Sequence, residues 1–227
     1  SLRLCFARKF PVGLAATLCA CLLSLWGCGS DPVVRPPGPD HGESHPPIKT
    51  DIFVGGEGGY HTYRIPALIA TARGTLLAFC AGRKNTAADH GDIDLLLRRS
   101  FDRGAMWEPV QLVWEDGNHT IGNPAPVVDR DTGFIWLGFC KDNDRVYVTH
   151  SEDDGQTWAK PRDISDDVVR KKWTWVATGP GVGIQIERGE HAGRLVIPCD
   201  HRDEHPVPDD SRNRCFSHVI YSDDHGK

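Results

Sequence analysis

The stretch Ser151-Glu-Asp-Asp-Gly-Gln-Thr-Trp158 carries a pattern that recurs within this chain of 227 residues. A second copy of Ser-x-Asp-x-Gly-x-x-Trp is Ser100-Phe-Asp-Arg-Gly-Ala-Met-Trp107, and Ser222-Asp-Asp-His-Gly226 matches the first half of a third copy. We name these stretches box 1 (Ser100–Trp107), box 2 (Ser151–Trp158) and box 3 (Ser222–Gly226). Serine and aspartate side chains bond the backbone of tight turns, and glycine adopts the positive φ that such turns require. The boxes therefore predict repeated β-hairpins, with the tryptophan rings packed between strands, rather than catalytic groups.

A second repeat precedes the boxes and supports the same architecture. It consists of a turn glycine, an apolar strand and a cysteine: Gly74-Thr-Leu-Leu-Ala-Phe-Cys80, Gly133-Phe-Ile-Trp-Leu-Gly-Phe-Cys140 and Gly193-Arg-Leu-Val-Ile-Pro-Cys199. From Asp51 onward the chain alternates short apolar runs with Gly, Asp and Asn turns, and only Ile164–Lys172 has the pattern of a helical turn. Repeating units of several strands are typical of β-propeller blades, so the sequence predicts an all-β fold.

The repeated cysteines have three possible roles. The first is that of small buried apolar residues at equivalent strand ends. The second is a disulfide between Cys199 and Cys215, which flank a predicted hairpin loop. The third is a metal site formed by the three thiols, with further possible ligands in Cys199-x-His201-x3-His205 and Cys215-x2-His218, although this spacing matches no familiar zinc pattern.

The N-terminal 28 residues differ from the rest of the chain. Three basic residues fall among the first nine, and an apolar run from Phe10 to Trp26 follows them, which is the pattern of an export signal. Leu25-Trp-Gly-Cys28 resembles a bacterial lipobox, whose cysteine would be acylated; a simple cleaved signal and an uncleaved anchor are the alternatives. Residues 29–50 contain six prolines and predict an extended linker, so the folded domain is expected at 51–227.

Bulk composition excludes some classes of function. The net charge is −5, with 25% charged and 39% apolar residues, which is ordinary for a globular protein and gives no reason to expect a nucleic-acid partner. The sequence has no nucleotide-binding or haem motif, and no cofactor or metal is expected.

Two segments carry candidate chemistry. Tyr63-Arg-Ile-Pro66 places an arginine among apolar neighbours, where it needs either an internal acidic partner or an anionic ligand. Asp89-His-Gly-Asp-Ile-Asp94 places three acids within six residues, in a loop before a strand. A carboxylic acid kept protonated by its surroundings can act as a general acid on a leaving-group oxygen.

These segments, together with Gly122-Asn-Pro124, Thr178-Gly-Pro-Gly181 and the boxes, resemble the exo-α-sialidases (neuraminidases) over residues 51–227. The resemblance implies a six-bladed β-propeller, of which this sequence would hold roughly the first three blades. It also implies a retaining glycoside hydrolase that removes terminal sialic acids from glycoproteins and gangliosides. The expected location is the cell envelope or outside the cell, with membrane contact only through the N-terminal signal or lipid anchor.

The resemblance also implies roles for particular residues. Asp89 is the expected acid/base catalyst, and Arg64 is the first of three arginines that bind the sialic acid carboxylate. Arg83 is expected to contact the O4 region of the sugar, and Asn123 to lie near the pocket. Trp173 and Trp175 precede the Gly-Pro-Gly segment and either line the N-acetyl side of the site or pack in the core.

The sequence departs from the family pattern in one respect. The family's nucleophilic tyrosine, its glutamate partner and the other two arginines follow the third box and are not among these 227 residues. We therefore expect this stretch by itself to be inactive. The alternative function is a non-catalytic, sialoglycan-binding propeller lipoprotein.

Overall fold

The computed structural model describes residues 2–5, 49–203 and 215–227, and all of its secondary structure belongs to a compact unit of residues 1–7 and 50–227. The expected export signal (1–28) lies outside the described residues except for Leu2–Cys5, and the expected linker (29–50) lies outside them except for its last two residues. In the described part of the chain, no helix is long and apolar enough to cross a membrane.

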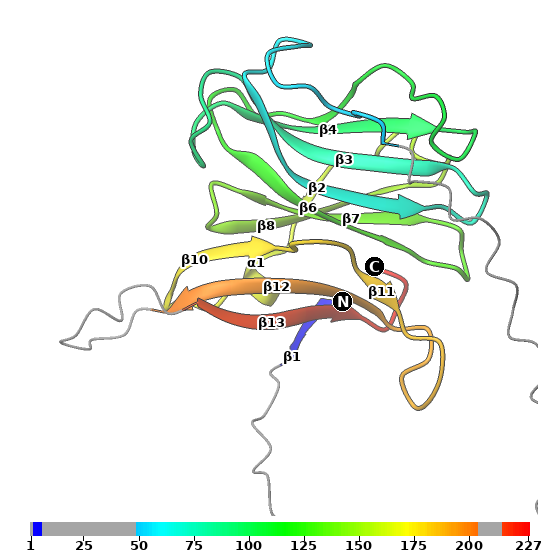
Figure 1. The fold of residues 1–227 in the computed structure, drawn as a ribbon. Helices are drawn as coiled ribbons and strands as arrows, with labels where there is room; N and C mark the ends of the chain where they lie inside the picture. Colours follow the sequence, from blue (N-terminus) through cyan, green and yellow to red (C-terminus); the bar gives the residue numbers. More distant parts are fainter. Residues whose placement is uncertain (1, 6–48, 204–214) are drawn as a thin grey trace, which may run out of the picture. The chain divides into compact units, whose positions relative to one another are not determined.

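The strands form three antiparallel sheets, of which the first two are meanders in chain order (Figure 1). The first sheet contains β2 (Thr62–Ala70), β3 (Leu76–Arg83), β4 (Ile93–Ser100) and β5 (Gln111–Trp114). The second contains β6 (Ile121–Val128), β7 (Ile135–Lys141), β8 (Arg145–Ser151) and β9 (Arg162–Asp163). The third contains β10 (Trp173–Thr178), β12 (Leu195–Asp203) and β13 (Cys215–Ser222), with β11 (Ile184–Gln185) beside β12 and β1 (Leu2–Cys5) beside β13.

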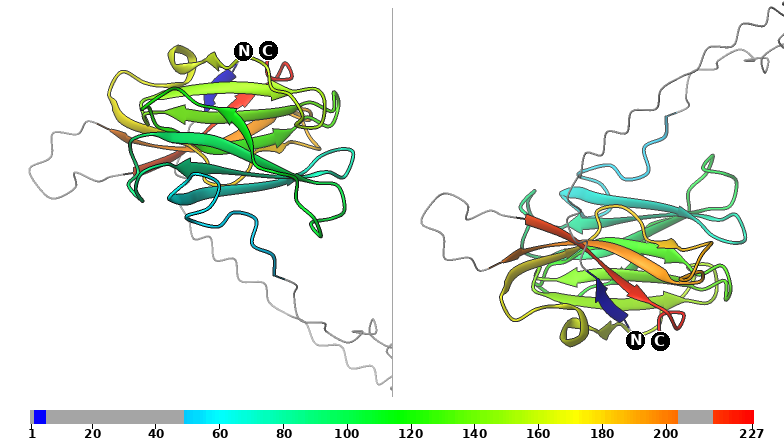
Figure 2. Two further views of the ribbon diagram at one scale, coloured as in Figure 1. Left: turned by 90° about the horizontal axis from the view of Figure 1, so that it is seen from above. Right: turned by 90° about the horizontal axis from the view of Figure 1, so that it is seen from below.

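The second sheet lies between the other two, because β6 contacts both β2 and β10. Figure 2 shows β1 at the outer edge of the third sheet, next to β13 and near the end of the chain. The three sheets are blades of a β-propeller, as the repeats predict. The helical turn predicted over Ile164–Lys172 is also present, as the short helix α1 (Ser165–Val168) between β9 and β10.

The hydrophobic core consists of two clusters, one at each boundary between blades. The first joins side chains of β2, β3 and β4 to Ile135, Leu137 and Phe139 of β7. The second joins Trp136 and Cys140 of β7 to β10, β12 and β13. Because successive side chains of a strand point to opposite faces, β7 contributes alternate residues to each cluster, and it has no charged residue before Lys141.

The boxes form the same hydrogen-bonded turn three times. The serine Oγ accepts the glycine N–H at 2.8 Å in box 1, 2.9 Å in box 2 and 2.7 Å in box 3, and it donates to the aspartate Oδ1 at 2.9, 2.8 and 2.6 Å. The residue before each glycine also has a positive φ, of 62° at Arg103, 65° at Asp154 and 56° at His225. Two consecutive left-handed residues therefore turn each box back toward the preceding strands.

Boxes 2 and 3 each contact the blade before their own. Asp154 accepts a hydrogen bond from Thr75 in the β2–β3 turn, and Trp158 packs edge-on against Phe79 of β3, with ring centroids 5.7 Å apart. His225 of box 3 pairs with Asp129 in the β6–β7 turn at 2.9 Å. The tryptophan of box 2 thus packs between blades, which adds to the predicted packing between strands.

The three repeated cysteines are buried, as the first of their proposed roles predicts. The proposed Cys199–Cys215 disulfide is wrong, because both are free thiols. Cys199 pairs in register with His218 and Cys215 with Arg202, so the two cysteines are three positions apart along the β12–β13 ladder, about 10 Å.

The proposed Cys/His metal site is not formed in the described residues, and His205 lies outside them. Within the described ranges, only Asp129, Asp131 and His225 bring three possible metal ligands together. The carboxylate of Asp129 already accepts hydrogen bonds from His225, Gln185, Thr132 and the Asp131 N–H, at 2.8–3.0 Å. This group is therefore a polar contact between the second and third blades.

The close contact between box 2 and the first blade predicts a measurable stability difference. Gly155 has a φ of 81°, and a Cβ added there would lie 3.1 Å from a methyl group of Leu77. Gly133 has a φ of 77°, but a Cβ there would meet nothing within 4 Å. Both Gly→Ala changes introduce strain of about 1–2 kcal/mol from the positive φ. We expect Gly155→Ala to lose a further ~1–3 kcal/mol through overpacking. Urea denaturation of both variants checks this, and equal losses would contradict the contact.

Candidate active site

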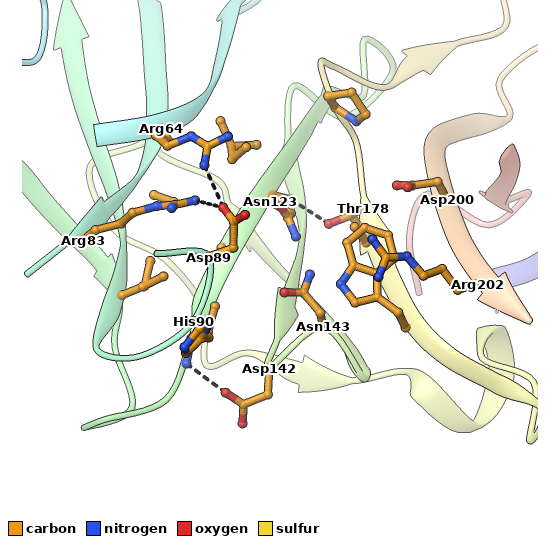
Figure 3. Close-up of a pocket in the computed structure, with 18 residues that line it drawn as sticks. Arg64, Arg83, Asp89, His90, Asn123, Asp142, Asn143, Thr178, Asp200 and Arg202 are labelled. Carbon is orange, nitrogen blue, oxygen red and sulfur yellow. Dashed lines mark hydrogen bonds and ion pairs between the residues drawn. The ribbon is translucent and has the colours of Figure 1, made fainter. Parts of the chain in front are cut away.

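A cavity of about 580 Å³ lies at one end of the inner strands, with walls from all three blades (Figure 3). The four residues singled out in the sequence all line it: Arg64 on β2, Arg83 at the end of β3, Asp89 in the following loop and Asn123 on β6. The structure therefore brings the predicted site residues together, although their chemical roles stay predictions.

A repeated irregularity borders the cavity, within the first strand of two blades and directly after it in the third. Ile65, Asn123 and Gly179 have positive φ values of 55°, 58° and 78°, and each directly precedes a proline. At the first two positions the strand pairing shifts register, as in a β-bulge. A β-branched residue such as Ile65 rarely adopts a positive φ, and such strained residues concentrate at functional sites. The residue before each of these positions lines the cavity: Arg64, Gly122 and Thr178.

Asp89 lies between two arginines that contact the same carboxylate oxygen. Its Oδ1 is 2.7 Å from Arg64 Nη1 and 2.6 Å from Arg83 Nη2. The hydrogen bond from Arg83 is the main reason that the pKa of Asp89 lies below its usual value, and the Arg64 charge acts in the same direction. The side chain is 76% exposed. The two cations stabilise the carboxylate form, which opposes the expectation that the surroundings keep this acid protonated.

Arg83 also organises the loop that carries Asp89. Its side chain is only 4% exposed, and its Nη1 donates to the carbonyl oxygens of Ala87 and, at 2.6 Å, Ala88. The guanidinium therefore lies inside the loop and holds both its backbone and its carboxylate. The predicted contact of Arg83 with the sugar remains a prediction.

Two further groups hold the ends of this loop. At its base, Lys84 Nζ lies 2.8 Å from Asp92 Oδ1 and 3.1 Å from Asp94 Oδ2. On its far side, the Thr120 hydroxyl bonds both the N–H and the C=O of Gly91, at 3.0 Å each. Asp142 in turn accepts the Thr120 N–H at 2.9 Å. The position of Asp89 is thus set by residues from the first and second blades.

Asn123 joins the second blade to the third at the floor of the site. Its backbone carbonyl accepts a hydrogen bond from Thr178 Oγ1 at 2.6 Å, and the Thr178 N–H donates to Cys140 Sγ at 3.2 Å. These bonds satisfy polar groups where the β6 pairing is interrupted.

The wall opposite Asp89 comes from the third blade. Trp175 lines the cavity, and the Arg202 guanidinium lies 5.1 Å from the centre of its ring. Burial raises the pKa of Asp200, which lines the same wall. Trp173 does not line this cavity but stacks on His201, with centroids 3.8 Å apart. Of the two tryptophans expected near the site, Trp175 is there and Trp173 packs elsewhere.

Sequence reasoning missed several polar residues of the cavity, namely Asp142, Asn143, Asp200 and Arg202. The repeat of strand and cysteine contained a signal for them. Arg83 follows Cys80 by three residues, and the missed residues follow Cys140 or Cys199 by one to three residues. Because the three cysteines lie in equivalent strands, the polar residues that follow each of them meet at one end of the blades.

Comparison with known proteins gives concordant matches. Residues 74–227 match the BNR repeat-like domain family. The chain is 37% identical to an exo-alpha-sialidase of Aspergillus fumigatus, a match covering 62% of this chain and 41% of that protein. It is 30% identical to a sialidase of Micromonospora viridifaciens over 98% of this chain and 37% of that protein. The chain thus spans about two fifths of the length of curated relatives that it matches.

Solved structures show the same likeness. The Hadza microbial sialidase Hz136 superposes with a TM-score of 0.64 at 28% identity, covering 74% of this chain and 37% of that one. A leech intramolecular trans-sialidase superposes with a TM-score of 0.68 at 16% identity, over 80% of this chain and 45% of that one, which shows the fold alone. Fold, repeats and relatives agree, and the chain belongs to the exo-α-sialidase family, with its BNR repeat-like domain at residues 74–227.

Proposed function

We propose that the complete protein is a retaining exo-α-sialidase that hydrolyses terminal sialic acids of glycoproteins and gangliosides. The observation that carries this proposal is the exposed carboxylate of Asp89, held between Arg64 and Arg83 in a cavity lined by three blades. The names of the relatives support the same activity.

The geometry of Arg64 supports its proposed role as a carboxylate-binding residue. Its side chain is 46% exposed at the cavity, and it already holds one carboxylate, that of Asp89, at 2.7 Å. A planar guanidinium binds carboxylates through parallel hydrogen bonds, which suits the carboxylate of a sialic acid.

In the proposed reaction Asp89 protonates the departing glycosidic oxygen. A tyrosine, activated by a glutamate, attacks the anomeric carbon, and a second displacement by water retains the configuration. A neutral phenol avoids the repulsion that a carboxylate nucleophile would meet from the substrate carboxylate, which is why such enzymes depart from the usual pair of carboxylates. The tyrosine, the glutamate and two more arginines would come from residues outside this sequence.

One observation favours the alternative of a non-catalytic sialoglycan-binding protein. The pKa of Asp89 is lowered, mainly by the hydrogen bond from Arg83, which favours an ionised carboxylate over a proton donor. Release of sialic acid from sialyllactose by the complete protein distinguishes the two functions. Binding without turnover would favour the alternative.

We further propose that the protein is exported and anchored by a lipid on Cys28. The basic and apolar N-terminal pattern and Leu25-Trp-Gly-Cys28 support this location. Mass spectrometry of the mature N-terminus tests it. A diacylated Cys28 is the expected result, and an unmodified terminus at another residue would contradict the anchor.

The proposed acid role predicts a dependence on the leaving group. In the complete protein, Asp89→Ala should lower kcat/KM by about 10²–10⁴-fold on sialyllactose, whose leaving group needs protonation. The loss should be much smaller on a nitrophenyl sialoside, because its leaving group departs as a stable anion. Steady-state kinetics on both substrates check this, and equal losses would argue against the acid role.

The hydrogen bonds of Thr120 predict a positioning role. Thr120→Val keeps the shape of the side chain but removes both bonds to Gly91, which should free the loop of residues 84–92 and lower kcat on sialyllactose by about tenfold or more. Thr120→Ser keeps the hydroxyl and is the matched control. Hydrogen–deuterium exchange of the loop provides a readout independent of activity. Unchanged exchange and kcat in Thr120→Val would contradict the role.

The expected tyrosine, glutamate and two further arginines are not among these 227 residues. We therefore expect that the 227-residue chain by itself does not release sialic acid from a fluorogenic sialoside. Measurable turnover by the purified chain would show that the nucleophile lies within it.

A further inference from the structure

Tyr60, just ahead of β2, donates a hydrogen bond to a buried acid. Its Oη lies 2.7 Å from Oδ2 of Asp94, the second residue of β4. The Asp94 side chain is 3% exposed, and its other oxygen, Oδ1, is buried with no hydrogen-bond partner in the described part of the chain. A buried carboxylate requires compensating partners. Within the described residues it has them only at Oδ2, which contacts the Tyr60 hydroxyl and, at 3.1 Å, Lys84 Nζ.

A glycine in β3 makes room for this contact. Gly82 pairs with Asp94 in the β3–β4 ladder. A Cβ at Gly82 would lie 2.8 and 2.9 Å from two ring carbons of Tyr60, closer than side-chain atoms pack. The Tyr60 ring therefore lies directly against the backbone of Gly82, an approach that a glycine allows. Across this glycine the Tyr60 hydroxyl reaches Asp94.

Lys84 connects Asp94 to the loop that carries Asp89. Its Nζ lies between two carboxylates, 3.1 Å from that of Asp94 and 2.8 Å from that of Asp92. The Lys84 N–H also donates to the Asp92 carbonyl oxygen at 3.1 Å. Lys84 and Asp92 are the two ends of the loop of residues 84–92, so these contacts close the loop at its base. Asp89 lies inside the closed loop.

We propose that Tyr60 is a positioning residue for Asp89. Its hydroxyl holds the Asp94 carboxylate in place, Asp94 holds Lys84, and Lys84 closes the loop that presents Asp89 to the cavity. Tyr60 is not among the residues that line the cavity, so it acts through the loop rather than on a ligand. The inference rests on the proposed function only in taking Asp89 as the acid.

Loss of the Tyr60 hydroxyl would weaken the base of the loop. Asp94 Oδ2 would then contact Lys84 alone. Because a buried carboxylate with too few partners is unfavourable, Lys84 would shift toward Asp94 and away from Asp92. The loop would open at its base and leave Asp89 less well placed. Proton transfer requires the acid within hydrogen-bond reach of the leaving-group oxygen, so the step that needs this proton would slow.

Tyr60 is a hydrogen-bond donor rather than a base. Burial, followed by the bond to Asp94, raises the pKa of Tyr60 above its usual value, so the hydroxyl stays protonated. A protonated hydroxyl suits a donor to a buried carboxylate. Because Tyr60 also lies outside the cavity lining, it is not the tyrosine nucleophile of the proposed reaction.

Steady-state kinetics of the complete protein test the positioning role. Tyr60→Phe removes only the hydroxyl, and we expect kcat on sialyllactose to fall by about tenfold with KM changed by less than about twofold. On a nitrophenyl sialoside, whose leaving group needs no protonation, the loss should be below about twofold. Combined with Asp89→Ala, Tyr60→Phe should cause no further loss on sialyllactose, because the group that it positions is absent.

Tyr63→Phe is the matched control. It removes the hydroxyl of the neighbouring ring, with centroids 5.5 Å apart, but that hydroxyl bonds the Glu57 carbonyl oxygen and not Asp94. We expect kcat on both substrates to stay within about twofold of the unmodified protein. A tenfold loss in this control as well would overturn the role assigned to the Tyr60–Asp94 bond.

Hydrogen–deuterium exchange of residues 84–92 tests the loop without relying on turnover. Exchange should be faster in Tyr60→Phe and unchanged in Tyr63→Phe. Unchanged exchange in Tyr60→Phe would overturn the proposal whether or not the protein is active. Faster exchange with no turnover of sialyllactose by the unmodified protein would support the contact with the loop and count against the sialidase function. Equal kinetic losses on the two substrates, or an additive loss with Asp89→Ala, would overturn the positioning role and leave the sialidase function standing.

Discussion

The hydrogen bonds between serine, aspartate and glycine in each box hold two successive residues at positive φ, and the rest of the structure depends on this turn. It directs the residue before the glycine and, in box 2, the tryptophan ring toward the preceding blade. The contacts of boxes 2 and 3 join each of these blades to the blade before it. The three joined blades all contribute residues to the cavity, including residues of β2, β6 and β10.

The two arginines that contact Asp89 differ in how firmly the structure holds them. Arg83, Lys84 and Thr120 hold the loop of Asp89 through buried or backbone contacts from two blades. Arg64 is half-exposed at the cavity and contacts the same carboxylate oxygen. The carboxylate of Asp89 is thus held by one buried and one accessible cation.

Much of the fold was predictable from the sequence, because a cysteine strand is followed by a box three times along the chain. Arg64, Arg83, Asp89 and Asn123 were found because they lie in short motifs. Asp200 and Arg202 were missed because their spacing from Cys199, which is the signal for them in the sequence, points to the cavity only once the third blade is packed against the second. The ionised state of Asp89 was missed for a related reason, since two arginines reach it from separate strands. The predicted Cys199–Cys215 disulfide was wrong because the register of β12 and β13 pairs each of these cysteines with another residue.

In each blade the residue before the positive-φ position lines the cavity, and it is an arginine in the first blade, a glycine in the second and a threonine in the third. Gly122 has an ordinary φ, and a Cβ there would meet only Ala81 at a normal contact distance of 3.6 Å. The cavity wall at Gly122 thus has room for a side chain. A larger residue introduced there would change the shape of the cavity without altering the strands that form it.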